Sequence, residues 1–230
     1  MKFNVKWLWF AIFIISCLIP IELLAHGVDD NTKAFLQSNQ GVAFLPFMYI
    51  GAKHMVTGYD HLLFLVGVIF FLYRTKDVLI YVSFFTVGHS LTLLFGVWQD
   101  LQVNPYIIDA IIGLSIVYKG FDNLGGFKRL IGFQPNTKAA VLVFGLFHGF
   151  GLATKLQEFE FDQEGLIENL IAFNLGVELG QFFALTFVLI LLSVWRRYNS
   201  YLKFSVASNA LLMSGGIMLT LFQLTGYITQ

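Results

Sequence analysis

The sequence predicts an all-α integral membrane protein, with a bundle of six transmembrane helices that follows an apolar N-terminal helix. Its mean hydropathy is +0.73, and 57% of the 230 residues are hydrophobic whereas only 12% are charged, which is too apolar for a water-soluble domain. Apolar runs of about 20 residues recur along the chain, and a helix of that length crosses about 30 Å of hydrocarbon. Helices are expected because lipid offers no partners to exposed backbone groups.

The first apolar run differs from the later ones. Lys2 and Lys6 precede a short apolar stretch, and the residues that end at Ala25 weakly resemble the cleavage site of a secretory signal. Residues 1–25 are therefore expected to be a signal peptide or a first transmembrane helix. Residues 26–230 are expected to form a single polytopic membrane domain.

Six further apolar runs predict the bundle itself. Each run is close to the length needed for one crossing, and short polar segments separate the runs. The transmembrane helices are expected near residues 55–73, 78–98, 105–121, 139–154, 165–194 and 204–226.

The distribution of basic residues predicts the orientation of this bundle. If Lys2 and Lys6 are cytoplasmic, successive crossings leave every other Lys and Arg except Lys33, Lys53 and Lys155 on the same side. This is the positive-inside pattern of membrane proteins. It predicts a multi-pass protein of a bacterial-type inner cell membrane, with the C-terminus outside.

Composition also excludes several function classes. The formal net charge is zero, and the chain has neither a nucleic-acid-binding motif nor the phosphate loop of an ATP-driven pump, so no nucleic-acid partner is expected. The single cysteine, Cys17, rules out an intrachain disulfide and a zinc site built on cysteines. The lipid bilayer is the partner that composition predicts, and the sequence leaves protein partners and the oligomeric state open.

Several ionisable side chains fall inside the predicted spans, in the half nearer the outer surface. An ionisable group at such depth costs several kcal/mol unless it is paired or hydrated, so it usually faces the bundle interior and marks a site or a path. The structural alternatives are a helix cap for His61, a carboxylate that favours a helix N-terminus for Asp109, and an interhelical hydrogen bond for a lone His89 or His148. The residues concerned are Asp60, His61, His89, Asp109, His148 and Glu178.

One predicted helix carries a polar stripe on an otherwise apolar surface. Asn174, Glu178 and Gln181 stand at i, i+4 and i+7, which places them on one face. Gly176 and Gly180 form a pair of small residues on much of the opposite arc, which is typical of close helix packing. The stripe therefore favours a functional role for Glu178.

The stretch HMVTGYDH begins and ends with a histidine. In one regular helix His54 and His61 would stand about 10 Å apart along the axis, too far to bind one ion. Either the helix breaks near Gly58 or the two histidines are separate stations on a path, and a break is favoured because glycine weakens helices. Asp60 and His61 would then begin a helix, as an oriented metal ligand or as a proton-relay pair.

These motifs resemble those of a known family of membrane proteins, HupE/UreJ. The stretch from His54 to His61 has that family's H-x5-D-H spacing with Gly58 in place, and the resemblance covers roughly residues 40–226. The later blocks that are similar to the family's further motifs are GHS at 88–90, FHGFG at 147–151 and NLGVELGQ at 174–181.

The resemblance implies uptake of a divalent metal ion, because HupE/UreJ proteins are regarded as nickel or cobalt permeases associated with hydrogenase and urease. Two departures weaken the metal identity more than the fold: Met55 replaces the proline usual after the first histidine, and Gly151 stands where the hydrogenase-linked branch has a second histidine. Carried over one position at a time, the resemblance implies metal ligands at His54, Asp60, His61, His89, His148 and Glu178. The side chains expected to support them are Ser90, Asp109, Asn174 and Gln181.

The residue types indicate the same ions without the family. Histidine nitrogens with carboxylates and no thiolate suit Ni²⁺, Co²⁺ or Zn²⁺, as a transported substrate or as a bound ion. We expect His61, His89 and His148 to converge with Asp60 and Glu178 on one interior site, because separate exposure to lipid would repeat the penalty for ionisable groups.

Three function classes remain open. The favoured one is a metal-ion permease rather than an enzyme. The second is a membrane-embedded metal-dependent hydrolase, in which histidines bind zinc and Glu178 or Asp60 acts as general base. The third is a metal-binding assembly protein. A permease also needs polar groups toward the inner side of the membrane. The inner halves of the spans offer few, and this deficit counts against the permease; the polar residues there are Ser83, Ser115, Tyr118 and Asn123.

Overall fold

The structure is a computed structural model that describes residues 41–157 and 165–229. Within these ranges every regular element is helical and no strand occurs, so the predicted all-α class is confirmed for the described part of the chain. The predicted signal peptide or first helix, residues 1–25, lies outside the described residues. The helices are α3 (Phe44–Thr57), α4 (Tyr59–Ile69), α5 (Thr75–Trp98), α6 (Pro105–Asn123), α7 (Gly126–Ile131), α8 (Thr137–Gln157), α9 (Leu166–Trp195) and α10 (Ser200–Thr229).

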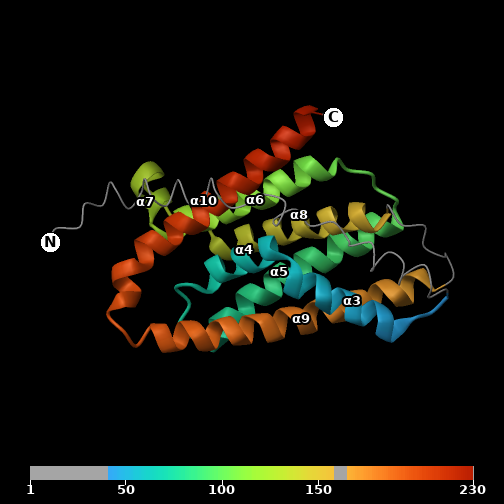
Figure 1. Cartoon of the computed structure of the whole chain (residues 1–230), viewed down its shortest axis with the longest axis horizontal. Helices are drawn as coiled ribbons and strands as arrows, with labels where there is room; N and C mark the ends of the chain where they lie inside the picture. The colour runs from blue at the N-terminus through green and yellow to red at the C-terminus, as the bar shows by residue number, and fades with distance from the viewer. Residues whose placement is uncertain (1–40, 158–164, 230) are drawn as a thin grey trace.

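The long helices pack side by side in pairs (Figure 1). The most extensive contacts join α3 to α9, α5 to α8 and α6 to α10. The short helix α4 lies among these pairs and contacts α3, α5, α6, α9 and α10. A side chain on α4 can therefore meet side chains from several other helices.

Glycines allow α3 and α9 to approach each other backbone to backbone. A Cβ atom at Gly176 would overlap the carbonyl oxygen of Met48, and one at Gly180 would lie 2.7 Å from the carbonyl oxygen of Ala52. Only a residue without a side chain fits such contacts. The predicted packing role of this glycine pair is confirmed.

The break predicted near Gly58 is also confirmed. Helix α3 ends at Thr57 and α4 begins at Tyr59, and Gly58 between them leaves the helical conformation with φ −72° and ψ 84°. A Cβ atom at Gly58 would lie 2.9 Å from the carbonyl oxygen of His54 and 3.1 Å from Nδ1 of His61. Glycine is thus the residue that lets the chain turn between the two histidines.

Among the described helices, four are long and apolar enough to cross a membrane, namely α5, α8, α9 and α10. Helix α6 has 19 residues and carries Asp109, Lys119 and Asp122. The span predicted near 55–73 is represented by α4, whose 11 residues cover about 17 Å at about 1.5 Å per residue. The described chain is therefore a polytopic helical bundle, and the count of six spans stays an expectation.

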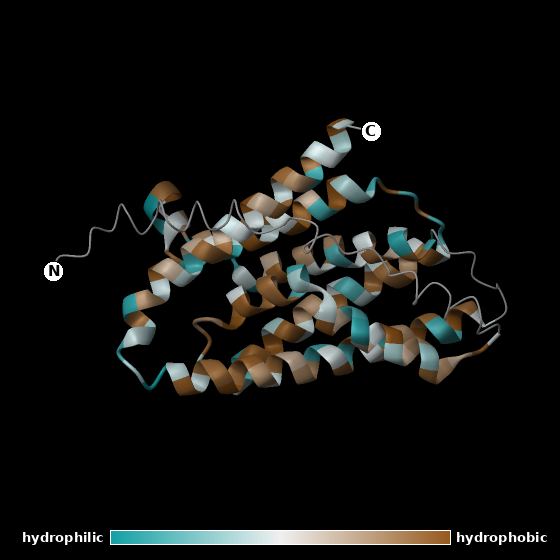
Figure 2. Cartoon of the chain, in the orientation of Figure 1, coloured by the Kyte–Doolittle hydropathy of each residue, from teal (hydrophilic) through white to brown (hydrophobic). Residues whose placement is uncertain are grey.

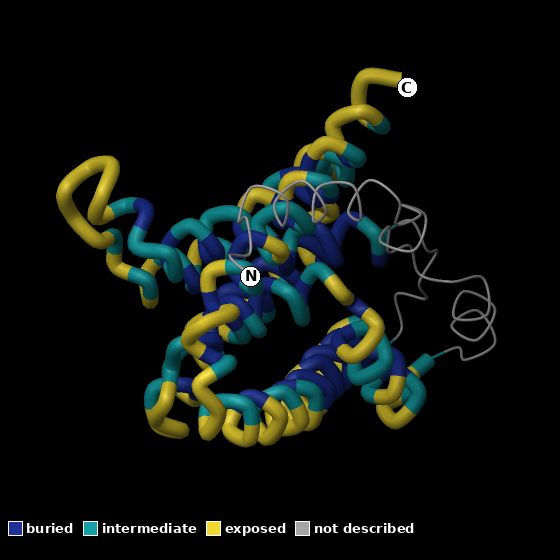
Figure 3. The backbone as a smooth tube through the Cα atoms, turned by 60° about the vertical axis from the view of Figure 1, so that its left-hand side comes forward, coloured by how far each residue is buried: buried dark blue, intermediate teal, exposed yellow. Residues whose placement is uncertain are grey.

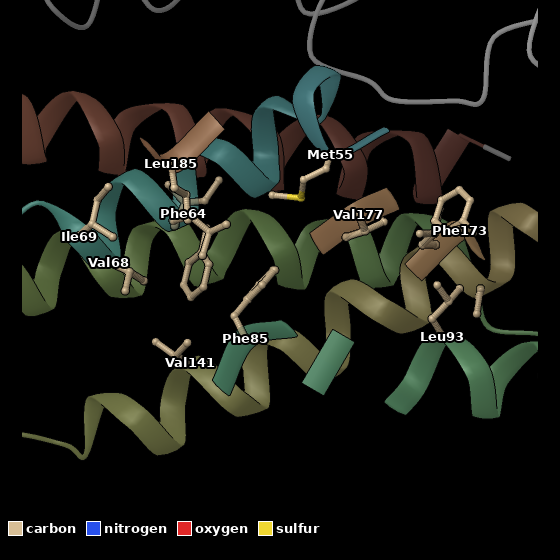
Figure 4. Close-up of a cluster of buried hydrophobic side chains, with 14 of the residues drawn as sticks. Met55, Phe64, Val68, Ile69, Phe85, Leu93, Val141, Phe173, Val177 and Leu185 are labelled. Atoms are coloured by element: carbon tan, nitrogen blue, oxygen red, sulfur yellow. The ribbon is translucent and has the colours of Figure 1, made fainter. Parts of the chain in front are cut away.

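Large apolar side chains fill the core and also cover the outer faces of the bundle. Phe64, Phe85 and Ile69 are fully buried between the helices (Figure 4). The outward faces of the long helices are apolar and exposed (Figures 2 and 3), with Phe183 and Leu202 as examples. A bundle that is apolar on the outside as well as the inside is suited to lipid rather than to water.

Basic side chains gather at one end of the bundle. Arg74 lies in the connection between α4 and α5, Lys128 and Arg129 lie on α7, and Arg196 and Arg197 lie in the turn between α9 and α10. Figure 1 shows these three segments at the same end. This is the end that the sequence predicts to be cytoplasmic, and its sidedness in the membrane stays a prediction.

Candidate metal centre

Three histidines from three different helices surround His61 on α4. The ring centroid of His61 lies 5.2 Å from that of His54 on α3, 5.8 Å from that of His89 on α5 and 4.8 Å from that of His148 on α8. His61 is 4% exposed, His89 1% and His148 0%. The structure thus brings together the three histidines that were expected to converge, and it adds His54 to them.

Asp60 orients the central imidazole of this group. Its Oδ1 atom accepts a hydrogen bond from the backbone N–H of His61 at 2.9 Å and lies 2.8 Å from Nδ1 of the same residue. An ionised carboxylate only accepts, so Nδ1 carries the proton and the lone pair of Nε2 is available. A carboxylate behind an imidazole is the usual arrangement of a metal-binding histidine.

His148 is oriented by the backbone in the same way. Its Nδ1 atom lies 2.7 Å from the carbonyl oxygen of Phe144, which can only accept, so Nε2 again keeps its lone pair. Gly149 brings α8 against α5, because a Cβ atom there would overlap the carbonyl oxygen of His89. The contact of these two backbones brings both rings within 6 Å of the His61 ring between centroids, at 5.8 Å for His89 and 4.8 Å for His148.

Four buried imidazole nitrogens of the group have no hydrogen-bond partner. They are Nε2 of His61, Nε2 of His148 and both ring nitrogens of His89. Leaving such an atom buried and unsatisfied costs about 1–3 kcal/mol, so a cluster of them calls for a ligand. Neutral imidazole nitrogens are suitable donors for Ni²⁺, Co²⁺ and Zn²⁺.

The spacing of the rings suits a shared ion, although the side chains are not arranged as a finished site. Two imidazoles on one tetrahedral ion at about 2 Å have centroids about 5 Å apart. In the described residues, however, no group of three or more His, Cys, Asp and Glu side chains is already placed to hold an ion. Ion binding would therefore require rotation of the rings.

An aromatic layer covers one side of the histidine group. Phe85 lies 5.0 Å from His148 and 6.1 Å from His89, and Phe64 lies 5.5 Å from His148 and 5.7 Å from Phe144 between ring centroids. On α4, α5 and α8 alike, the phenylalanine stands about one turn from the histidine toward the basic end of the bundle. Figure 4 shows Phe64 and Phe85 facing each other in this layer.

Glu178 is not placed with the histidines. Its side chain is exposed, whereas Asn174 and Gln181 are buried. Asn174 donates to the carbonyl oxygen of Leu170, and Gln181 accepts from the hydroxyl of Thr86 at 3.3 Å. Glu178 is four residues after Asn174, and four residues of an α-helix leave a net rotation of about 40°. This rotation takes Glu178 past the edge of the buried face of α9. Its role as a ligand stays a prediction.

The remaining candidates occupy the surroundings of the group. Ser90 is partly buried beside His89 on α5. Asp109 is buried on α6, beyond the first turn of the helix, and pairs with Lys155, while Asn104 caps α6 by accepting from the backbone N–H groups of Tyr106 and Ile107. Lys155 was missed in the sequence as part of the site, although it stands seven residues from His148 and hence on the same face of α8.

The family model described as HupE / UreJ protein matches residues 30–230. The chain belongs to the HupE/UreJ family. Neither a curated protein nor a solved structure matches the chain. Membership of HupE/UreJ, together with four helices that can cross a membrane, makes this a multi-pass membrane protein of a family related to nickel and cobalt handling.

Proposed function

We propose that this HupE/UreJ protein is a permease for a divalent transition-metal ion of the nickel or cobalt type. The observation that carries the proposal is the gathering of His54, His89 and His148 around His61, where buried ring nitrogens of His61, His89 and His148 lack partners. The buried imidazoles of His61, His89 and His148, on three different helices, would be expensive in lipid. They serve a cation that binds inside the bundle.

The donor set selects the class of ion. Neutral imidazoles bind Ni²⁺, Co²⁺ and Zn²⁺ well and bind Mg²⁺ or Ca²⁺ poorly, since those ions prefer oxygen ligands. Asp60 orients the His61 imidazole and supplies a negative charge close to the ion. We therefore assign the ion to His61, His89 and His148, with His54 beside them.

The proposed path runs from the outer face to the histidines and then past the aromatic layer. In the proposed topology six helices span a bacterial-type inner membrane, the basic end is cytoplasmic and the C-terminus lies outside. Phe64, Phe85 and Phe144 separate the histidines from the cytoplasmic end. Passage of an ion requires these rings to move, as in transporters that open to one side at a time.

The aromatic layer also fits a second candidate, a membrane-embedded metal-dependent hydrolase, because the layer closes one side of the histidine group and an enzyme needs access from one face only. That enzyme would need a carboxylate as general base beside the metal. Asp60 is hydrogen-bonded to His61, and Glu178 is exposed on α9. The site thus offers less to a hydrolase, or to an assembly protein that only stores a metal, than to a permease.

The test is uptake of radioactive nickel and cobalt into proteoliposomes that contain the purified full chain. The double variant His61→Ala, His148→Ala should lose uptake while remaining folded in the membrane, because two of the converging imidazoles are removed. Thr225→Ala is the control, since Thr225 is an exposed residue of α10 whose hydroxyl donates to the carbonyl oxygen of Leu221, and it should retain uptake. Wild-type uptake by the double variant would refute the proposal.

A further inference from the structure

A second polar group lies close to the histidines and joins three helices. The carboxylate of Asp109 on α6 accepts from Nζ of Lys155 on α8 at 2.8 and 3.1 Å, and from Nε2 of Gln223 on α10 at 3.3 Å. The side chain of Lys155 is 17% exposed and that of Asp109 11%. The ion pair is thus mostly buried, and it can still be reached from outside.

This ion pair lies one helical turn from the metal centre. A Cβ atom at Gly151 would be 3.6 Å from Oδ1 of Asp109, and Gly151 is three residues beyond His148 along α8. Phe144 lies on the other side of His148, one turn toward the basic end. The carboxylate of Asp109 is therefore on the side of the histidine group that faces away from the aromatic layer.

We propose that Lys155 is a built-in competitor of the metal ion for Asp109. In this inference, which rests on the proposed function, Asp109 is a second cation-binding carboxylate on the outer approach to the histidines. The Lys155 ammonium occupies it until a divalent cation displaces it. The lysine thereby sets the concentration at which the ion reaches the metal centre.

A purely structural role explains the pair less well. Buried ion pairs contribute little net stability compared with apolar side chains of similar size. The chain also contains a comparison within itself, because Lys119 and Asp122 pair at 2.6 Å on a single helix near the basic end, with side chains only 8% and 4% exposed. Lys155 instead reaches across to another helix from a position two residues before the end of α8, so its flexible stem can swing outward and release Asp109.

The chemistry of the exchange is favourable for a divalent ion. A carboxylate attracts a doubly charged cation more strongly than a single ammonium at the same distance. The amide oxygen of Gln223 is a further oxygen donor next to the carboxylate once the side chain turns. Loss of the positive charge at position 155 should therefore strengthen metal binding, whereas loss of the negative charge at position 109 should weaken it.

The experiment measures Ni²⁺ affinity by titration calorimetry on the purified full chain in detergent. Lys155→Met should raise the affinity about tenfold, because the competing charge is gone while Asp109 remains. Lys155→Gln is the second variant, for use if Lys155→Met folds poorly. It should give the same gain in affinity, because it also removes the charge while it keeps a hydrogen bond to Asp109. Asp109→Asn should lower the affinity, and Lys119→Gln, at the comparison pair, should leave it at the wild-type value.

The outcomes separate this inference from the proposed function. Wild-type protein that binds Ni²⁺, with Lys155→Met and Lys155→Gln unchanged or weaker, would overturn the role of Lys155 and leave the histidine centre intact. Wild-type protein that binds no Ni²⁺ would overturn the proposed function and the inference with it. A gain in both Lys155 variants that is absent in Lys119→Gln supports the competitor role.

Discussion

At the residue scale, metal binding depends on how each imidazole is held. His61 and His148 both direct Nδ1 at a fixed acceptor, the carboxylate of Asp60 and the carbonyl of Phe144. Both rings therefore keep Nε2 for the interior of the group. A carboxylate can be removed by mutation and a carbonyl cannot, so Asp60 is the place where this arrangement can be tested.

Asp60→Ala should weaken Co²⁺ binding by about 10- to 100-fold, because the carboxylate that orients His61 and fixes its tautomer is lost. Asp60→Asn should have a smaller effect, since the amide oxygen can still accept from Nδ1. The measurement is the visible absorption of bound Co²⁺ during titration of the purified protein. Asp100→Asn is the control, because Asp100 lies in the exposed α5–α6 connection at positive φ, which asparagine tolerates. Equal affinity in Asp60→Ala and wild type would contradict this role.

At the element scale, glycine contacts between helices position the site. The contact of Gly176 with Met48 fixes α3 on α9, and α3 carries His54 to the group. Gly58 then turns the chain so that α4 can present His61. The histidines are thus placed by backbone packing as much as by their own side chains.

Gly176→Ala should destabilise the protein by about 1–3 kcal/mol, because the new methyl group forces α3 away from α9. Gly215→Ala is the matched control, since nothing lies within 4 Å of a Cβ atom at that position of α10. The control should be neutral or slightly stabilising, as alanine favours a helix. Thermal aggregation of the detergent-solubilised variants measures both. A Gly176→Ala protein as stable as Gly215→Ala would disprove the close packing.

The sequence predicted those parts of the site that follow from local chemistry. The break at Gly58 follows from the spacing of two histidines, and the convergence of the histidines follows from the penalty for ionisable groups in lipid. The position of Glu178 could not be predicted, because about 40° of helix rotation separates it from Asn174 and only the packing of α9 decides which of the two is buried. The Lys155–Asp109 pair joins residues 46 positions apart, and no local pattern indicates which helices meet there.

At the scale of the whole molecule, the bundle has one basic end and a histidine group closed toward that end by phenylalanines. Successive long helices run in alternating directions, so the α4–α5 connection, α7 and the α9–α10 turn lie at this end, with Arg74, Lys128 and Arg196 in them. Positive residues are retained on the cytoplasmic side. If the basic end is cytoplasmic, as proposed, the histidines lie on the outer side of the phenylalanine layer.

A cysteine placed at Leu130 in a Cys17→Ser background should be protected in intact cells from a thiol reagent that does not cross membranes. A cysteine at Gln102, in the connection at the opposite end, should be labelled. Disruption of the cells should expose both positions. Labelling of position 130 in intact cells would invert the topology and contradict the proposed direction of uptake.

The central claim is that the four-histidine group binds the divalent ion. X-ray absorption spectroscopy of the purified protein loaded with one equivalent of Co²⁺ or Ni²⁺ tests it most directly, because imidazole ligands scatter in a recognisable way. The account predicts at least two imidazole nitrogens at about 2 Å from the metal, and a loss of this signal in His61→Ala. A bound metal coordinated by oxygen alone, or an unchanged spectrum in His61→Ala, would contradict it.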